Sequence, residues 1–215
     1  MDIHAPDGPI RSLKEFAVHI LIVTIGILIA FGLEGLRETW RENRAVSETL
    51  ASFHQELVLD QQNLRQEVAG VKRGDADLTR LLNDLPQLSK NPKELTKRAE
   101  SIKLPFYFFR TTAWESATAS GILSRLSTDD LNRFADAYLS IKNYQEAQKG
   151  TIPTWLSIGI YFRSRPTLSP SDLSGGEEKL RTLQKQVQIL EHLAEEFQGG
   201  LTHAIGEDQS TSEGK

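Results

Sequence analysis

An uncharged apolar run over residues 16–33 (FAVHILIVTIGILIAFGL) constrains the fold of this chain more than any other feature. At about 1.5 Å rise per residue, a helix over this run is roughly 27 Å long, close to the hydrocarbon thickness of a bilayer. A helix on the surface of a soluble protein would carry a charged side chain at every third or fourth position, and this run has no Asp, Glu, Lys or Arg. The run therefore predicts a transmembrane helix, which we place at residues 12–35.

The run could also be the core helix of a soluble protein or a cleaved signal peptide. The core helix of a soluble protein is usually shorter and has partner elements on both sides. A cleaved signal peptide has an apolar region of about 7–15 residues that ends in an A-x-A-like site. Ala30-Phe31-Gly32 is the nearest match to such a site, and the helical pattern continues past it through Leu36 and Trp40. An uncleaved membrane anchor is therefore favoured.

The orientation of the anchor depends on the basic residues near its ends. Arg11 and Lys14 precede the run, and Arg37, Arg41 and Arg44 follow it. The positive-inside rule compares the two sides, which are nearly equal here. Because a short segment before an uncleaved span most often stays in the cytoplasm, we expect the rest of the chain on the extracytoplasmic side.

The remainder of the chain has the apolar spacing of helices. Spacings of three, four and seven predict that the membrane helix continues as an amphipathic stalk as far as the Gly70–Gly74 region. A second seam of the coiled-coil or bundle type is formed by Leu180, Leu183, Val187, Leu190, Ala194, Phe197, Leu201 and Ala204. We predict an all-α fold: an N-terminal transmembrane helix continuing into a long stalk that packs in an extramembrane helical bundle. We expect the seam over residues 183–197 to pack against the stalk at Leu50, Phe53, Leu57 and Leu64, either in the same chain or across a dimer.

The boundaries follow from turn-forming and capping residues. We predict an irregular lead over residues 1–11, the membrane helix over 12–35, a helical domain over 36–205 and a disordered tail over 206–215. Within the domain, short helices are expected over Asp75–Leu85, after Asn91-Pro92, and from Thr111 or Thr112 to Gly121. Ser127 is predicted to cap a further helix that Gly150 and Pro153 break or kink, and residues 164–176 form a turn-rich linker.

The proline and the four aromatic residues of Pro105–Phe109 (PFYFF) allow two interpretations. Such a cluster can dip into a membrane, but packing between helices is the commoner reason for it and is favoured here. The apolar stretch Trp155–Phe162 is too short to cross a bilayer as a helix, so a buried helical segment is expected, with an interfacial anchor as the alternative.

Composition excludes several function classes. The net charge is −4, with no cluster of Lys and Arg, which argues against nucleic acid as a partner. The absence of cysteine excludes disulfides, thiol catalysis and Cys-type zinc sites, and the five histidines match no metal-binding pattern. Leu173–Glu177 (LSGGE) looks like the signature loop of ATP-binding cassette ATPases, but no phosphate loop accompanies it, so a capping box of Ser174 and Glu177 is the simpler interpretation. We therefore predict no catalytic, cofactor-binding or metal-binding residues, no cofactor and no enzymatic activity.

Gly26 and Ala30 have the small-xxx-small spacing that lets two membrane helices approach closely, so both are candidate helix-pairing residues. The expected partners are the lipid bilayer and either a second copy of the chain or another membrane protein.

Three segments together resemble an uncharacterised family of bacterial single-span membrane proteins, a domain of unknown function. They are Ile25–Ala30 (IGILIA), Trp40–Asn43 (WREN), and Ala113–Ser116 (AWES) followed by Ser120-Gly121. That family has a similar membrane segment and a central W-x-S…S-G motif, although it tends to show Asn-Trp-Asn-Glu where this chain has Trp40-Arg41-Glu42. The resemblance implies a bacterial membrane protein and no activity. Together with the orientation expected above, it gives an inner (cytoplasmic) membrane location with a periplasmic domain. Because Trp114 lies near Gly121 in the most motif-like stretch outside the membrane, we expect Trp114 to be buried and the motif of Trp114, Ser116 and Gly121 to be structural.

The sequence therefore predicts a single-pass, membrane-anchored helical protein that acts in binding or scaffolding. One alternative is a ligand-sensing helical bundle that signals through a partner, because the residues before the span are too few to fold as an output module. The other alternative is an unrecognised enzyme, since catalytic residues can meet in space without a sequence motif.

Overall fold

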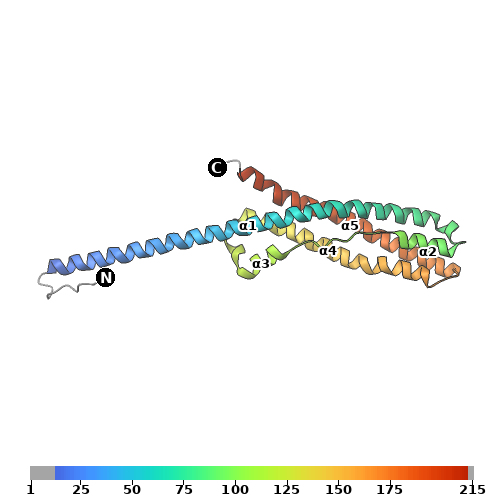
Figure 1. The fold of residues 1–215 in the computed structure, drawn as a ribbon, viewed down its shortest axis with the longest axis horizontal. Helices are drawn as coiled ribbons and strands as arrows, with labels where there is room; N and C mark the ends of the chain where they lie inside the picture. Colours follow the sequence, from blue (N-terminus) through green and yellow to red (C-terminus); the bar gives the residue numbers. More distant parts are fainter. Residues whose placement is uncertain (1–12, 213–215) are drawn as a thin grey trace. The chain divides into compact units, whose positions relative to one another are not determined.

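A computed structural model describes residues 13–212 of the chain and divides it into two compact units, Met1–Glu48 and Thr49–Lys215. Throughout the described residues, every regular element is helical, which confirms the all-α prediction. The elements in chain order are α1 (Leu13–Leu88), α2 (Pro92–Ser101), α3 (Thr112–Ser120), the 3₁₀ helix η1 (Ile122–Arg125), α4 (Thr128–Arg163) and α5 (Pro170–Ser212) (Figure 1). The predicted lead over residues 1–11 lies outside the described residues.

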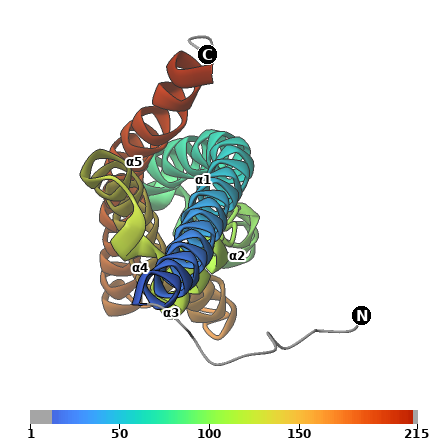
Figure 2. The ribbon, with the colours of Figure 1, turned by 90° about the vertical axis from the view of Figure 1, so that its left-hand side faces the viewer.

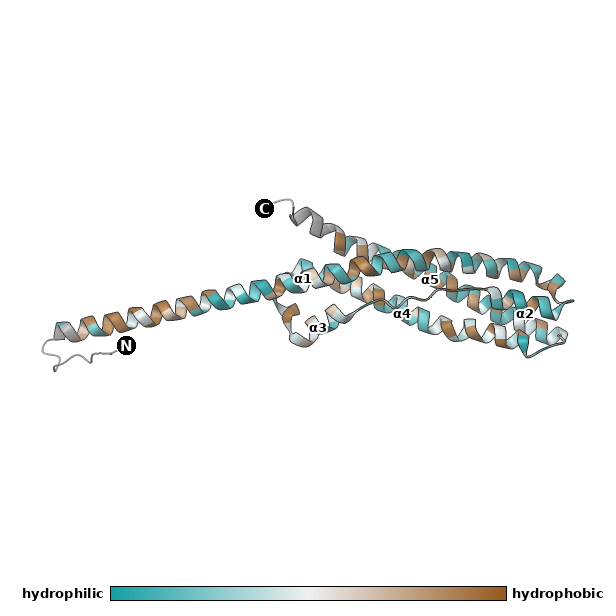
Figure 3. Cartoon of the chain, in the orientation of Figure 1, coloured by the Kyte–Doolittle hydropathy of each residue, from teal (hydrophilic) through white to brown (hydrophobic). Residues whose placement is uncertain are grey.

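The first unit contains the apolar part of α1. This helix is long and apolar enough to cross a membrane, and no residue of its apolar window is buried against the rest of the protein. Its large side chains are open to the surroundings, with 72% of Phe31 and 63% of Leu33 exposed. Figure 3 shows the same stretch as a largely hydrophobic helix whose colour changes to hydrophilic further along. An apolar helix of this length with no buried residue has the kind of surface that a bilayer would cover.

The second unit is a helical bundle. α4 and α5 are long antiparallel neighbours, and α2 packs against α4 (Figures 1 and 2). Salt bridges also join α2 to both long helices. Arg98 of α2 pairs with Asp84 of α1 (3.0 Å), and Glu100 of α2 pairs with Arg163 of α4 (2.5 Å). The core is continuous along α1, α4 and α5; its largest fully buried apolar side chains include Phe53, Leu57, Leu64, Leu78, Phe134, Ile141, Phe162, Leu180 and Phe197.

The last helix packs beside α1 as predicted, but at a different level. Gln184 Nε2 donates to Thr79 Oγ1 (2.8 Å), and the charges of Lys72 and Asp75 act on Glu191. The part of the seam around residues 184–191 therefore lies beside the Lys72–Thr79 part of α1. Phe53, which we expected to meet the seam, instead packs against the rings of Trp114, Phe134 and Tyr138. Helical spacing identifies an apolar face but leaves its register open.

Three predicted helix ends are confirmed. Asn91 caps α2 by accepting a hydrogen bond from the Glu94 amide (3.3 Å), with Pro92 in the first helical position. Ser127 caps α4 by accepting from the Asp130 amide (3.0 Å). Gly121 ends α3 with φ of 74°, in the left-handed region that glycine adopts without strain.

The predicted break at Gly70–Gly74 is wrong, and so is a break at Gly150 and Pro153; a kink at Gly150 and Pro153, the other possibility, stays a prediction. α1 runs unbroken through Gly70, Gly74 and Pro86, and α4 runs through Gly150 and Pro153. At Gly70 and Gly74 the reason is packing, because Pro105 and Leu104 lie against the helix there. A Cβ on Gly70 would lie 2.1 Å from Pro105 Cγ, and one on Gly74 would lie 2.3 Å from Leu104 Cδ2. These glycines are needed for a close approach rather than for a turn.

This close approach predicts the effect of Gly70→Ala. The new methyl group would overlap the Pro105 ring, so we expect the free energy of unfolding to fall by about 1–3 kcal/mol. Gly150→Ala is the matched control, because no atom lies within 4 Å of its Cβ position and alanine is favoured over glycine in a helix by up to about 1 kcal/mol. Chemical denaturation of the two variants should therefore give shifts of opposite sign. Equal shifts would show that Pro105 does not pack on Gly70.

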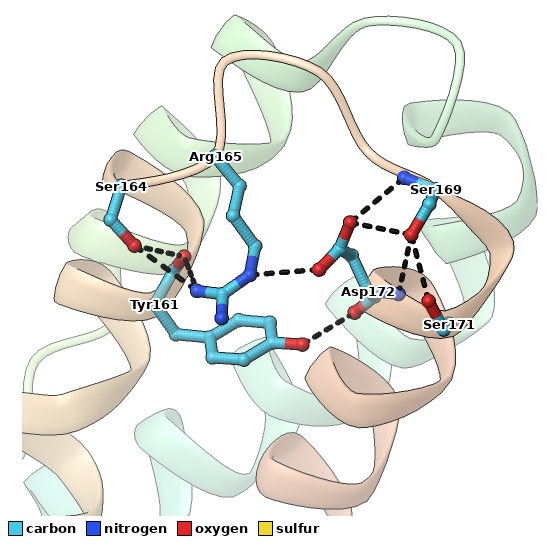
Figure 4. A network of polar contacts seen from close by, with 6 residues as sticks. All are labelled: Tyr161, Ser164, Arg165, Ser169, Ser171 and Asp172. Atoms are coloured by element: carbon cyan, nitrogen blue, oxygen red, sulfur yellow. Dashed lines mark hydrogen bonds and ion pairs between the residues drawn. The ribbon is translucent and has the colours of Figure 1, made fainter.

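The turn between α4 and α5 replaces the predicted linker. α5 begins at Pro170, inside the segment we expected to be irregular, and its cap is Ser169 with Asp172 rather than Ser174 with Glu177. Arg165 donates to Asp172 Oδ1 (2.9 Å), and the Tyr161 hydroxyl donates to the Asp172 carbonyl (2.8 Å) (Figure 4). The hydrogen bonds from Ser169 and the charge of Arg165 lower the pKa of Asp172.

The glycines of the LSGGE segment also have a packing role. A Cβ on Gly175 would lie 2.6 Å from the Tyr161 hydroxyl, and one on Gly176 would lie 2.6 Å from Phe162 Cζ. The two glycines let α5 approach the aromatic end of α4. At its other end, α5 continues to Ser212, through most of the segment predicted to be a disordered tail.

Candidate functional site: a carboxylate row and a polar groove

Three acidic side chains of α1 are buried in the bundle. Asp60 and Glu67 have no exposed surface and Glu56 has 9% exposed. Asp60 and Glu67 face the segment between α2 and α3, residues 102–111, which we call the strap, and Glu56 faces the first turn of α3. The strap has no regular structure, so its backbone groups need partners from elsewhere.

The carboxylates of α1 accept hydrogen bonds from backbone amides at three-residue intervals. The Tyr107 amide donates to Glu67 Oε2 (2.9 Å), and the Arg110 amide donates to Asp60 Oδ2 (3.0 Å). The amide of Ala113, in the first turn of α3, donates to both oxygens of Glu56 (3.2 and 3.3 Å). Because Thr111 makes no side-chain cap, Glu56 is the acceptor that caps α3.

Side chains of α4 pair with the strap's carbonyl groups. Gln145 Nε2 donates to the Phe109 carbonyl (2.7 Å), Gln148 Nε2 to the Tyr107 carbonyl (3.3 Å) and Trp155 Nε1 to the Ile102 carbonyl (3.0 Å). The strap thus lies between α1, which accepts from its amides, and α4, which donates to its carbonyls. This pairing fixes the strap without a neighbouring strand.

The aromatic side chains of the strap pack mostly inward. Phe109 is buried against Tyr144 and Phe197, and Phe106 meets the ring of Trp155 edge to face (5.8 Å). Core packing was the favoured interpretation of this cluster, and it holds for Phe109 and Phe106. Phe108 is the exception, with 89% of its surface exposed.

Two tyrosines of α4 complete the acidic row. The Tyr144 hydroxyl donates to Glu67 Oε1 (2.9 Å), and the Tyr138 hydroxyl donates to Glu56 Oε1 (2.9 Å). Burial raises the pKa of both tyrosines, and the neighbouring glutamates raise it further. Each tyrosine therefore keeps its proton and remains a hydrogen-bond donor.

Asp60 is the least satisfied member of the row. Its Oδ1 is buried and has no hydrogen-bond partner among the described residues. Burial raises its pKa to about 7, the charge of Glu56 adds to the shift, and the amide and charge of Arg110 oppose it. Burial also raises the pKa of Glu67, against the hydrogen bonds from Tyr107, Gln148 and Tyr144. The Asp60 carboxyl thus changes charge near neutral pH.

A polar groove of about 760 Å³ lies between α1 and α3, next to this row. It is lined by Thr49, Ser52, Gln55, Glu56 and Leu59 of α1, by Arg110 of the strap, and by Thr112, Ala113, Ser116, Ala117 and Ser120 of α3. The lining carries five hydroxyl groups, one amide, one carboxylate and one guanidinium. Glu56 and Arg110 therefore belong both to the groove and to the carboxylate row.

The predicted site residues take different places. Ser116 lines the groove and is exposed, whereas Trp114 faces the other side of α3. Trp114 is partly buried rather than fully buried; it stacks on Tyr138 at 5.2 Å and contacts Phe53 at 5.6 Å. Gly121 ends α3. Of these three residues, Ser116 is the one that lines the groove.

The candidate helix-pairing residues lie in the first unit. Gly26 has no atom within 4 Å of its Cβ position, and Ala30 is exposed on the same helix. Pairing through them stays a prediction.

Sequence reasoning missed the acidic row. Phe53, Leu57, Asp60, Leu64, Glu67 and Val71 are separated alternately by four and three residues, so Asp60 and Glu67 occupy seam positions themselves. A charged residue at such a position is costly to bury unless it has partners. Acidic residues at seam positions were therefore the feature of the sequence that could have indicated a buried polar site. The partners were not predictable, because they come from a strap and a helix that lie 40–82 residues further along the chain.

Comparison of the chain with models of protein families finds no match, and neither the curated proteins nor the solved structures provide a similar chain. The site must therefore be interpreted from its own chemistry. Over the residues described, no three His, Asp or Glu side chains converge as the ligands of a metal ion would. What the groove offers is a hydrogen-bonding surface: hydroxyl groups, an amide and one exposed cation.

Proposed function

We propose that this chain is a single-pass protein of a bacterial inner membrane that acts by binding a ligand in the α1–α3 groove, without catalysis. In this proposal, residues 16–33 lie in the bilayer and the helical bundle lies on the periplasmic side. The observation that carries the proposal is the groove itself: a polar hollow of about 760 Å³, which is within the range of known ligand sites. The exposed apolar surface of α1 supports the membrane anchor.

Membrane insertion is tested with Ile27→Lys. A lysine near the centre of a membrane helix costs about 2.5–3.5 kcal/mol on insertion scales, so we expect a large fraction of the variant to fail to insert. The measurement is the share of protein that stays in the membrane pellet after alkaline carbonate extraction. Thr39→Lys, beyond the apolar run, is the control and should leave the share unchanged. Unmodified protein in the supernatant would contradict the anchor.

Orientation can be tested because the chain has no cysteine of its own. Ser174 is exposed on α5, so Ser174→Cys offers one accessible thiol in the bundle. A maleimide that cannot cross the inner membrane should label this variant in cells whose outer membrane has been permeabilised. Labelling that requires lysis would place the bundle in the cytoplasm.

Binding in the groove is tested by photo-crosslinking in native membranes. A photoreactive amino acid at position 116 should form a ligand adduct, detected by mass spectrometry of the peptide that contains α3. The same amino acid at exposed position 174, away from the groove, should not. Ser120→Trp, which fills the groove, should abolish the adduct at position 116 while the helical content is kept. Equal adducts at the two positions, or an adduct that survives Ser120→Trp, would refute binding in this groove.

A further inference from the structure

The backbone and the side chain of Arg110 have different surroundings. Its amide donates to Asp60 Oδ2 (3.0 Å), inside the bundle. Arg110 is one of the residues that line the groove and is exposed, and its guanidinium forms no hydrogen bond or ion pair with any described residue. A guanidinium presents five donors that match the two oxygens of a carboxylate. The groove therefore contains an arginine whose side chain is available to a ligand.

The other charge in the groove is already engaged. Glu56 accepts hydrogen bonds from the Ala113 amide and from the Tyr138 hydroxyl, so its oxygens are directed to α3 and α4. The hydroxyl groups of Thr112 and Ser116 lie on the same wall of the groove and can donate to or accept from a ligand. The groove is thus suited to one negative group beside several neutral polar groups.

We propose, building on the function proposed above, that the ligand is a small organic carboxylate with hydroxyl or amide groups, that Arg110 pairs with its carboxylate, and that Asp60 takes up a proton when it binds. Arg110 links the binding of the carboxylate to the protonation of Asp60. Its side chain would neutralise the ligand, and the same positive charge favours the ionised form of Asp60. A ligand that engages the guanidinium withdraws part of this support from Asp60.

The charged groups around Asp60 are few. On α1 it faces Glu56, from the strap Arg110, and from α4 the Tyr138 hydroxyl, which stays neutral. The antiparallel register brings the α5 stretch around Ala204 to this level; there His203 is exposed, and Arg133 of α4 is paired with Asp130. Among the described residues, Arg110 is the cation whose charge favours the ionised form of Asp60, so an anion placed on Arg110 weakens that support. Protonation of Asp60 removes its negative charge and so relieves its repulsion with Glu56.

Proton uptake has a measurable consequence. The pKa of Asp60 is about 7 in the free protein. If binding raises it by about one unit, the affinity should be roughly tenfold higher near pH 6 than near pH 9. The sign is fixed: a proton taken up on binding makes binding tighter as the pH falls.

The ligand class is tested by calorimetry on the full chain in detergent micelles. The probes are d-glucuronate and N-acetyl-l-serine, each compared with its methyl ester. We expect saturable binding of at least one acid and at least tenfold weaker binding of its ester. Arg110→Gln should abolish binding, whereas Arg73→Gln, an exposed arginine of α1 outside the groove, should not. Absence of binding by both acids, an ester as tight as its acid, or binding that survives Arg110→Gln would overturn the proposal.

The proton is tested by repeating the titrations in buffers with different ionisation enthalpies. The wild-type protein should take up protons between about pH 7 and pH 8, just above the pKa of free Asp60. Asp60→Asn, which mimics the neutral acid, should keep the binding but lose the proton uptake and the dependence of affinity on pH. An unchanged proton uptake in Asp60→Asn would show that another group is responsible.

The two proposals fail in different ways. If the crosslinker at position 116 forms its adduct but neither acid binds, the groove is a binding site for another class of ligand. If Ser120→Trp leaves the binding of the acid unchanged, the carboxylate binds elsewhere and the groove is not its site.

Discussion

Replacing Glu67 with alanine should lower the free energy of unfolding by about 3–5 kcal/mol, among the largest effects of any single substitution in the bundle. Glu67 has no exposed surface and accepts hydrogen bonds from the Tyr107 amide, the Tyr144 hydroxyl and Gln148. Alanine would leave these three donors buried without their acceptor, and each unsatisfied donor costs about 1–3 kcal/mol, less when water can enter the space.

The effect of this change can be measured by urea denaturation of the full chain in micelles, followed by tryptophan fluorescence. Trp155 is a suitable reporter because its indole donates to the Ile102 carbonyl at the start of the strap. Glu178→Ala, an exposed acid of α5, is the control and should change stability by less than about 0.5 kcal/mol. A loss below about 1 kcal/mol in Glu67→Ala would show that the acid does not hold the strap.

Glu67 also shows what apolar spacing can and cannot predict. The heptad-like spacing correctly predicted that α1 and α5 pack in one bundle, because burial of an apolar stripe depends on periodicity alone. It did not predict which levels of the two helices meet. The position of Phe53 beside Trp114 and Tyr138 depends on the strap and α3, whose path the spacing does not encode.

Helix ends were predicted from the local conformational tendencies of glycine and proline. Whether a helix actually ends at such a residue depended on the side chains that pack against it. Gly121 behaves as expected, since no other chain segment constrains it and it adopts φ of 74° at the end of α3. Gly70 and Gly74 have the local pattern of a helix break, yet they lie in an unbroken helix where Pro105 and Leu104 occupy the space of a side chain. The sequence contained both members of each contact, but only the fold brings them together.

The groove was predictable only in part. Trp114, Ser116 and Gly121 stood out as a motif, and Ser116 lines the groove while Gly121 ends its α3 wall. The opposite wall was not predictable, because Thr49, Ser52 and Gln55 look like ordinary surface positions of a stalk. The place of Arg110 in the groove was not predictable either, because it depends on the hydrogen bond by which Asp60 holds the backbone of the strap at that residue.

Asp60 should make the stability of the protein depend on pH in an unusual direction. The pKa of its carboxyl is about 7 in the folded protein and near the ordinary value of 3.8 in the unfolded chain. Between these values the folded state holds a proton that the unfolded state has lost, so each unit of rising pH lowers the free energy of unfolding by up to 1.36 kcal/mol. Below about pH 4 this contribution is fully present, and above about pH 7 it is lost.

The total change expected from Asp60 is about 4 kcal/mol between pH 4 and pH 8, and the raised pKa of Glu67 acts in the same direction. Urea denaturation across this range measures it. Asp60→Asn should remove most of the slope, because the amide cannot ionise and its oxygen can still accept from the Arg110 amide. Asp77→Asn, on the partly exposed side of α1, should leave the slope unchanged within about 0.5 kcal/mol. The contrary result would be a wild-type protein that gains stability as the pH rises from 4 to 8, with the same profile in Asp60→Asn. Asp60 would then be ionised throughout this range. The amides of the strap would in that case offset the free-energy cost of burying its charge.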